Sequence, residues 1–465
     1  MIMENKNLWI LTEERPKREV IANILMMFAK DNKFACFIDT IRILPILEKG
    51  KFTFLYEVVG FRCNKIERVF IKSISGFSSF VDFLIFYQEK QPTQKDIPLY
   101  AIEETKTDDK ESRNTGVYQR ASKFVFLENY YPKTKKVMLY NLKIEQKEAP
   151  TATYIFGTKL LLTLGVEIQG KKLDEKIFKP FNSVDEIVSF KKKMRRAPKG
   201  NVPILIKKNG DKITISGRLF KSGGLAHDPN IGALSLISAA IRKLGWTGEI
   251  IITKHSLKQK HLQPDNKFIK IANRLNLQIK GLALPKSKDN NIYWKYEIEG
   301  EKLGTIFIHL VVENFTKGFS IFENHAGCEK GYFITSEGKY IPLEKYSDRK
   351  AYKAGDKDKI ISIPDLILID FGRSEVINVE GKKYQFRQNG INELKGFGDI
   401  EKTYIKKYYP KYKIIRTVVL YGGTETKVVE IEVGFLLNEN GDLVLGIKAP
   451  VLFREAIKNL LDFWS

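Results

Sequence analysis

Two carboxylates and an amine recur together twice in this sequence, each time where two apolar strands are expected to meet. In the C-terminal third, Asp365 opens an apolar, β-branched stretch, and Glu380 and Lys382 close the next such stretch after a short turn. Alternate residues of a strand project from the same face, so Glu380 and Lys382 point together, and strand pairing can bring Asp365 beside them. Such a group is costly to bury unless it binds something, and a divalent metal ion with an attacking water is one such use.

The N-terminal third repeats this pattern. One strand carries Asp82 near its start, a polar turn follows at 88–96, and the next strand ends in Glu104 and Lys106. The two-residue repeat of a strand predicts that Glu104, and not Glu103, shares a face with Lys106. An acid two residues before a lysine also occurs in several polar segments, so the strand context, rather than the tripeptide, distinguishes these two sets.

The composition favours a nucleic-acid partner. The chain has 465 residues, a formal net charge of +23, an apolar fraction of 43% and a pI near 9.5, with the positive charge spread along its length. A general lysine bias is the alternative explanation. No apolar run approaches a signal sequence or a membrane span, and three widely spaced cysteines predict neither a disulfide framework nor a zinc site. The five histidines form no tight pair, which disfavours nucleases built on clustered histidines. We therefore expect a cytoplasmic protein that does not enter a membrane.

The chain is too long for one domain and is expected to divide at 1–148, 149–300 and 301–465. Strands alternate with helices throughout, which predicts an α/β (α+β) protein with mixed sheets flanked by helices. The central region contains further strands, a glycine-rich loop and a basic run, and by elimination it is expected to read DNA bases. The residues there that either contact DNA or are ordinary exposed basic side chains are Arg218, Lys221, Arg242, Lys258 and Lys260.

The C-terminal set resembles the signature of the PD-(D/E)XK nuclease superfamily. Pro364-Asp365 is followed by Glu380-Gly381-Lys382 on adjacent predicted strands, with a helix after them. The N-terminal set is similar to variants of this signature in which another residue, here Val81, replaces the proline. Residues 102–124 also resemble the segment of type II restriction endonucleases that runs from the active-site strand into the following helix. The resemblance covers about residues 34–145 and 305–450.

This resemblance implies a Mg²⁺-dependent endonuclease acting on double-stranded DNA, with a PD-(D/E)XK-like domain at each end of a central recognition region. Asp82 with Glu104, and Asp365 with Glu380, would each hold one Mg²⁺ ion. The lysines would orient the attacking water or stabilise developing charge. The catalytic residues expected are Asp82, Glu104, Lys106, Asp365, Glu380 and Lys382. Gln119 and Arg120 are either phosphate contacts or ordinary residues of a surface helix, and Glu57 and Glu323 are candidates for an additional acid.

Two unlike sites in one chain predict that each cuts one strand of an asymmetric sequence, bound by a monomer. This describes a type II restriction enzyme, whose cognate DNA methyltransferase would be encoded separately. Two alternatives stay open. One is a structure-directed or repair nuclease with one active and one decayed site, and the other is a basic DNA-binding protein without catalysis.

Overall fold

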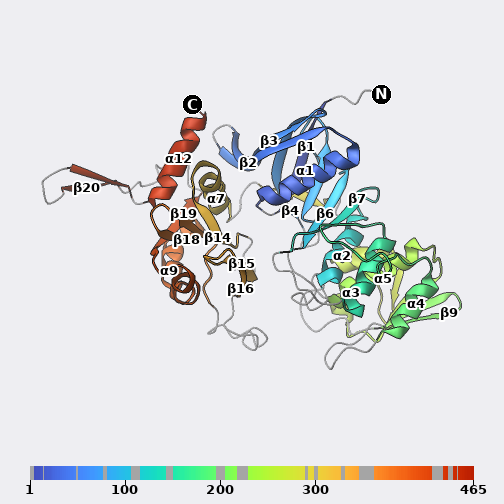
Figure 1. The fold of residues 1–465 in the computed structure, drawn as a ribbon. Helices are drawn as coiled ribbons and strands as arrows, with labels where there is room; N and C mark the ends of the chain where they lie inside the picture. Colours follow the sequence, from blue (N-terminus) through green and yellow to red (C-terminus); the bar gives the residue numbers. More distant parts are fainter. Residues whose placement is uncertain are drawn as a thin grey trace. The chain divides into compact units, whose positions relative to one another are not determined.

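The computed structural model describes residues 5–13, 15–48, 51–76, 81–105, 116–142, 150–194, 205–216, 229–288, 292–297, 302–325, 330–344, 361–421, 433–437, 443–447 and 449–464. These residues form two compact units (Figure 1). The first unit comprises 1–13 and 74–296, and the second comprises 14–73 and 297–465. These two units differ from the three domains expected from the sequence, which have their two boundaries at 148/149 and 300/301. Residues 149–296 of the central region belong to the first unit, and 14–73 belongs to the second.

The main sheet of the first unit contains five strands in the order β1-β5-β6-β7-β8. β5 pairs antiparallel with both β1 and β6, whereas β7 pairs in parallel with β6 and with β8. The short strand β13 pairs with the end of β4. The bounds are β1 Lys6–Thr12, β4 Ile66–Gly76, β5 Phe83–Tyr87, β6 Tyr100–Thr105, β7 Lys135–Tyr140, β8 Glu167–Gln169 and β13 Trp294–Tyr296.

Helices and a second sheet complete the first unit. The second sheet has the order β12-β11-β10-β9, and α5 packs against α2 and α3. Every residue of α5 from Ile231 to Ile241 is buried, which explains its uninterrupted apolar and small residues. The bounds are α2 Gly116–Leu127, α3 Ala152–Thr163, α4 Val184–Lys193, β9 Leu205–Asn209, β10 Lys212–Ser216, α5 Pro229–Lys243, β11 Glu249–Thr253, η1 Gln259–His261, α6 Lys267–Arg274 and β12 Leu277–Ile279.

In the second unit, helix α1 (Arg18–Asn32) precedes two long antiparallel strands, β2 (Cys36–Glu48) and β3 (Lys51–Cys63). Their register places Cys36 opposite Cys63, and the two form a disulfide. The sequence predicted no disulfide framework, and it gave no sign of this single disulfide. Residues 27 positions apart looked distant in the sequence, but the hairpin brings them together.

The second unit also contains a four-stranded sheet with the order β14-β17-β18-β19. Successive residues of each strand point to opposite faces of this sheet. Leu366, Leu368 and Val379 pack against α7 and α12, whereas Ile367 and Ile369 pack against the segment 400–412. The bounds are α7 Leu303–Phe315, β14 Phe319–Glu323, β17 Leu366–Asp370, β18 Glu375–Lys383, α9 Arg387–Lys395, β19 Lys413–Tyr421 and α12 Val451–Trp464.

The second unit also contains short helical turns and two further hairpins. Helices α9 and α7 cover opposite faces of the sheet: Gly390 of α9 lies against Val418, and Gly304 of α7 lies against its neighbour Val419 (Figure 1). The remaining elements are β15 Lys330–Ile334, β16 Tyr340–Glu344, η3 Tyr384–Phe386, α10 Gly398–Ile400, the π-helical turn η4 Glu401–Ile405, α11 Lys406–Tyr408, β20 Val433–Leu437 and β21 Leu443–Ile447.

The predicted fold class is confirmed: the chain is an α+β protein with mixed sheets flanked by helices. The strands β1-β5-β6-β7 and β14-β17-β18-β19 also have the same order of directions, with two antiparallel pairings followed by one parallel pairing. Among the described residues, no helix has the length and apolar character needed to cross a membrane.

Candidate active sites

The C-terminal carboxylates and the lysine lie together at the ends of β17 and β18. Leu366 is opposite Val379, so Asp365 faces Glu380 across the next pair of positions. Asp365 Oδ2 accepts a hydrogen bond of 2.9 Å from the backbone N–H of Gly381. Lys382 Nζ donates to Glu380 Oε1 at 2.7 Å. The structure thus brings together all three residues that the sequence predicted for this site.

Burial and like charge determine the electrostatics of this group. Burial, followed by the charge of Asp365, raises the pKa of Glu380 to about 8. Burial lowers the pKa of Lys382, but hydrogen bonds from its ammonium to Glu380 and Glu393 more than offset this, so the net shift is upward. Because two carboxyl groups this close do not readily ionise together, one of them keeps a proton. A bound cation would replace that proton.

Helix α9 holds Lys382 in place. Glu393 of this helix lies 2.9 Å from Lys382 Nζ. Gly390 approaches the sheet so closely that a β-carbon there would lie 2.9 Å from Lys382 Cγ and 3.0 Å from Val418 Cγ1. A glycine at this position therefore allows the helix to press the lysine side chain toward Glu380.

At the N-terminal site, Asp82 shares a lysine with Glu103. Phe83 is opposite Ile102, so the same register places Asp82 opposite Glu103. Lys123 of helix α2 donates to Asp82 Oδ1 at 3.1 Å and to the Glu103 carboxylate at 2.8 Å. Burial, followed by the charge of Asp82, raises the pKa of Glu103 to about 8. This is the pKa direction and the cause found for Glu380.

Glu104 lies differently from its expected place. Its backbone N–H donates to Asp82 Oδ2 at 2.8 Å, but its side chain accepts a hydrogen bond of 2.9 Å from Asn141. Successive strand residues point to opposite faces, so only one of the two adjacent glutamates can face Asp82, and the register selects Glu103. Lys106, the third residue expected at this site, lies outside the described residues.

The two sites share one hydrogen bond from the backbone to the aspartate. In each, Oδ2 of the aspartate accepts the N–H of the residue that follows the paired glutamate, Glu104 in one site and Gly381 in the other. By this correspondence Glu103 matches Glu380, and Thr105 takes the strand position of Lys382. The ammonium that contacts the glutamate therefore comes from a helix at one site and from a strand at the other.

The additional acids and phosphate contacts are placed as follows. Glu57 forms a two-point ion pair with Arg68, at 2.8 and 2.7 Å. Glu323 lies in a buried cluster on the α7 face of its sheet, whereas Asp365 belongs to the other face. The charge of Arg120 lowers the pKa of Glu103, though less than burial raises it. The side chain of Gln119 lies outside the described residues.

Of the proposed DNA contacts in the central region, Arg242 has a structural role. Its guanidinium donates to the carbonyl oxygens of Leu275, Trp246 and Gly248 at 2.8 to 2.9 Å. It therefore fastens the end of α5 to neighbouring turns. Lys258 and Lys260 are exposed, whereas Arg218 and Lys221 lie outside the described residues.

The expectation that the histidines form no pair was wrong. His309 of α7 and His325, which follows β14, lie with their ring nitrogens 2.9 Å apart. Sixteen residues separate them in sequence, and the turn from α7 into β14 brings them together. The one signal in the sequence for a polar group here is the spacing of His309 and Glu313, because residues four apart share a face when the segment is helical.

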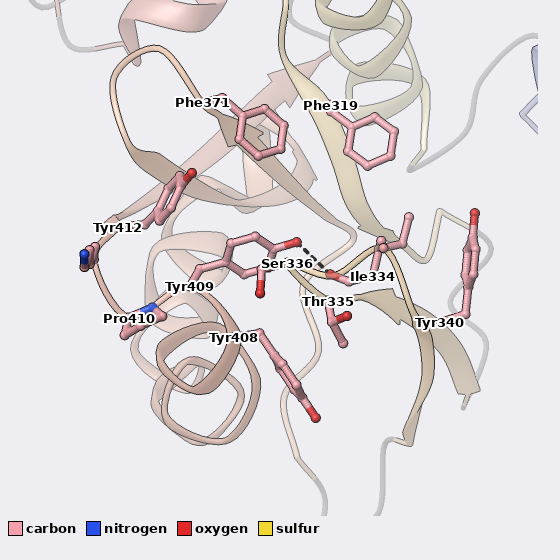
Figure 2. A pocket seen from close by; sticks show the side chains of 12 residues that line it. Phe319, Ile334, Thr335, Ser336, Tyr340, Phe371, Tyr408, Tyr409, Pro410 and Tyr412 are labelled. Atoms are coloured by element: carbon pink, nitrogen blue, oxygen red, sulfur yellow. Dashed lines mark hydrogen bonds between the residues drawn. The ribbon is translucent and has the colours of Figure 1, made fainter.

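A separate aromatic pocket of about 480 Å³ lies in the second unit (Figure 2). Figure 2 shows Phe319 and Phe371 at one side and Tyr409 donating to the carbonyl oxygen of Ile334, at 2.9 Å. Phe371 directly follows β17, whereas Asp365 directly precedes it. Five strand residues span about 17 Å. The pocket is therefore at the opposite end of the strand from the carboxylate pair.

Replacing Glu380 or Glu103 with glutamine is expected to stabilise the metal-free protein at pH 8. A raised carboxyl pKa means that folding retains a proton that the unfolded chain releases above its ordinary pKa of 4.5, so stability falls as pH rises from there to about 8. Glutamine removes that cost, which we expect to raise the free energy of unfolding by roughly 1–3 kcal/mol. Urea unfolding in EDTA at pH 5 and pH 8 measures the difference, which should be larger at pH 8.

The matched control is Glu57→Gln. It removes one half of a partly exposed ion pair with Arg68, and we expect a loss of less than about 1 kcal/mol. A loss of stability at pH 8 in both Glu380→Gln and Glu103→Gln would contradict the electrostatic description of these sites.

Each site thus combines two carboxylates and one ammonium near the end of a β-strand. Carboxylate oxygens are the ligands preferred by Mg²⁺, and an adjacent ammonium can stabilise negative charge on a phosphate. No protein-family model, curated protein or solved structure matches this chain.

Proposed function

We propose that the chain is a Mg²⁺-dependent endonuclease that hydrolyses phosphodiester bonds of double-stranded DNA with two active sites of the PD-(D/E)XK type. The observation that carries the proposal is the double occurrence of one construction. The two sites have the same strand directions, the same backbone hydrogen bond to aspartate, a facing glutamate and an ammonium on that glutamate. The net charge of +23 fits a polyanionic substrate.

The residues present fit a hard divalent cation. Asp365 and Glu380 would hold it at one site, and Asp82 and Glu103 at the other. Burial, followed by repulsion from the facing aspartate, raises the pKa of each glutamate, and a bound cation would relieve this repulsion. When bound, Mg²⁺ would polarise the scissile phosphate and lower the pKa of a coordinated water. Lys382 and Lys123 would orient that water and stabilise the charge that develops as its oxygen bonds to phosphorus and a P–O bond breaks.

Cleavage of phage DNA tests the proposal. We expect products with Mg²⁺ and none with EDTA. At limiting Mg²⁺ the rate should rise by up to about tenfold per pH unit between pH 6 and pH 8, because the cation must displace a proton from a carboxyl whose pKa is about 8. Mg²⁺-independent DNA binding without any product would contradict the proposal and favour a non-catalytic DNA-binding protein.

The form of the products refines the assignment. Discrete bands support a type II restriction enzyme that acts as a monomer on an asymmetric sequence in the cytoplasm, beside a separately encoded methyltransferase. A smear supports a structure-directed or repair nuclease instead. Run-off sequencing of the cleaved ends then gives the recognition sequence and the cut positions.

A further inference from the structure

A buried cluster of ionisable residues lies in the second unit, on the α7 face of the four-stranded sheet. It combines two imidazoles with two carboxylates and two cationic side chains. His309 is fully buried, whereas Glu323 and His325 keep some exposure. The cluster consists of Arg15, Lys17, His309, Glu313, Glu323 and His325.

The outer nitrogen of each imidazole has a partner that fixes its proton. His309 Nε2 lies 2.9 Å from Glu313 Oε1, and a carboxylate can only accept, so Nε2 carries a hydrogen. Arg15 Nη1 lies 3.0 Å from the other oxygen of Glu313, so this carboxylate pairs with a cation as well as with the imidazole. His325 Nδ1 lies 3.1 Å from the hydroxyl of Thr305, which itself donates to a backbone carbonyl and so accepts from Nδ1.

This assignment leaves two lone pairs facing each other. His309 Nδ1 and His325 Nε2 are 2.9 Å apart, and each belongs to a ring whose other nitrogen is already a donor. Two such nitrogens repel unless a positive centre lies between them. A metal ion coordinated by both nitrogens is such a centre.

We propose that His309, His325 and Glu323 form a binding site for one transition-metal ion of the zinc type, distinct from the two Mg²⁺ sites. The three ligand atoms lie within 4.8 Å of one another, and His309 Nδ1 is 3.7 Å from Glu323 Oε2. Two nitrogens bound to tetrahedral zinc are about 3.3 Å apart, so the rings need to separate by only about half an ångström. Imidazole ligands select zinc and its neighbours over Mg²⁺.

The second ring of contacts matches a metal site as well. Metal-bound histidines donate their other N–H to a carboxylate or to another oxygen acceptor, as His309 does to Glu313 and His325 does to Thr305. Arg15 Nε holds Glu323 Oε2 at 2.8 Å, and an oxygen with two lone pairs can still bind an ion. Three protein ligands leave the fourth position of a tetrahedral ion for water or an anion.

The charges of the cluster predict the direction in which one substitution changes the affinity for the metal ion. Arg15 and Lys17 balance Glu313 and Glu323, so a divalent ion adds two positive charges to a neutral group. Lys17 pairs with Glu323 and is 22% exposed, so it is the cation that can leave. Removing its charge should strengthen metal binding, whereas a purely structural cluster would be weakened by the same change.

The proposed zinc site lies on the opposite face of the sheet from Asp365 and Glu380, and it does not depend on these carboxylates. Glu323 and His325 flank Asn324, whose N–H donates to the carbonyl oxygen of Asp365 at 2.7 Å. Asp365 and Glu380 occupy the other face of the sheet. A metal ion here would fix the end of β14 to α7 and so support the backbone of Asp365.

Zinc binding to the full chain tests the inference. The protein carries Glu103→Gln and Glu380→Gln, so that the two acidic sites do not bind the metal, and is stripped with EDTA and then dialysed. Equilibrium dialysis with elemental analysis should find one Zn²⁺ per chain, and competition with a chromophoric chelator gives the affinity. Co²⁺ should give the visible absorption of a tetrahedral ion.

Four variants in this background give the decisive comparison. His309→Gln and His325→Gln should weaken Zn²⁺ binding at least about 100-fold, and Glu313→Gln about 10- to 100-fold. Lys17→Gln should tighten it. His261→Gln, in the first unit, is the matched control and should leave it unchanged. Uptake that is equal in the His309→Gln and His261→Gln proteins, or absent from the background protein, overturns the inference.

Circular dichroism confirms that each variant folds. If the histidine variants aggregate, Glu313→Gln and Lys17→Gln decide the matter, because the metal site predicts opposite effects on Zn²⁺ affinity. Weaker binding in both, or a change in neither, also overturns it. None of these readings depends on DNA cleavage.

Discussion

Lys382→Ala is expected to leave double-stranded DNA nicked in one strand, because in the proposed two-site nuclease it would disable one of the two sites. The substitution removes the ammonium that lies 2.7 Å from Glu380 and retains both carboxylates. We expect a loss of about 10²- to 10³-fold in the cleavage rate of the strand served by that site. A duplex with a different dye on each strand, digested with Mg²⁺ and resolved under denaturing conditions, measures both rates at once.

Lys383→Ala is the matched control for this variant. Lys383 is the next residue of β18 and points to the other face of the sheet, so it cannot reach Glu380. It should cut both strands at the normal rate. If Lys382→Ala slows both strands equally, one site makes both cuts. If it changes neither rate, the C-terminal site is the decayed one.

Lys123→Ala is expected to have the reciprocal effect and to nick the opposite strand. Lys123 bridges Asp82 and Glu103. Burial lowers the pKa of Lys123, but the charges of these two carboxylates raise it by more, so the net shift is upward. Its loss should reduce the rate for that strand by about 10²- to 10³-fold. The same two-dye digestion measures the effect. Lys123→Arg, which keeps the positive charge, should restore part of the activity.

Lys106→Ala is the comparison that separates two descriptions of this site. The spacing of the sequence favours Lys106, whereas the geometry around Asp82 favours Lys123. The second description predicts that Lys106→Ala cuts both strands and that Lys123→Ala does not. Lys136→Ala, which breaks a partly buried ion pair with Glu128, controls for the loss of a lysine in such a setting. A nicking phenotype in Lys106→Ala alone would contradict the role given to Lys123.

The sequence predicted the C-terminal set more completely than the N-terminal one, for a physical reason. A short turn, 371–374, joins β17 to β18, so the turn sets the register and Asp365 falls opposite Glu380. Residues 88–99 join β5 to β6, and such a connection does not determine which of two adjacent glutamates faces Asp82. A shift of one residue in the register there would exchange the two faces of β6, so that Glu104 instead of Glu103 would face Asp82.

Contacts between distant segments were beyond sequence reasoning. Lys123 reaches the carboxylates from a helix about 20 residues after Glu103, and a lysine on an amphipathic helix usually indicates a solvated face. The pairing of His309 with His325 depends on the path from α7 into β14. The boundaries of the two units could not be predicted either, because no change in composition marks residue 297, where the chain rejoins the unit that contains residues 14–73.

The interlaced path of the chain has a consequence for its synthesis. Residues 14–73 complete a unit with residues 297–465, and the 223 residues 74–296 lie between them. At ordinary translation speeds the ribosome needs roughly 10 to 45 s to make that insertion. The early hairpin β2–β3 therefore emerges long before its partners exist, while the first unit can be completed as soon as residue 296 leaves the exit tunnel.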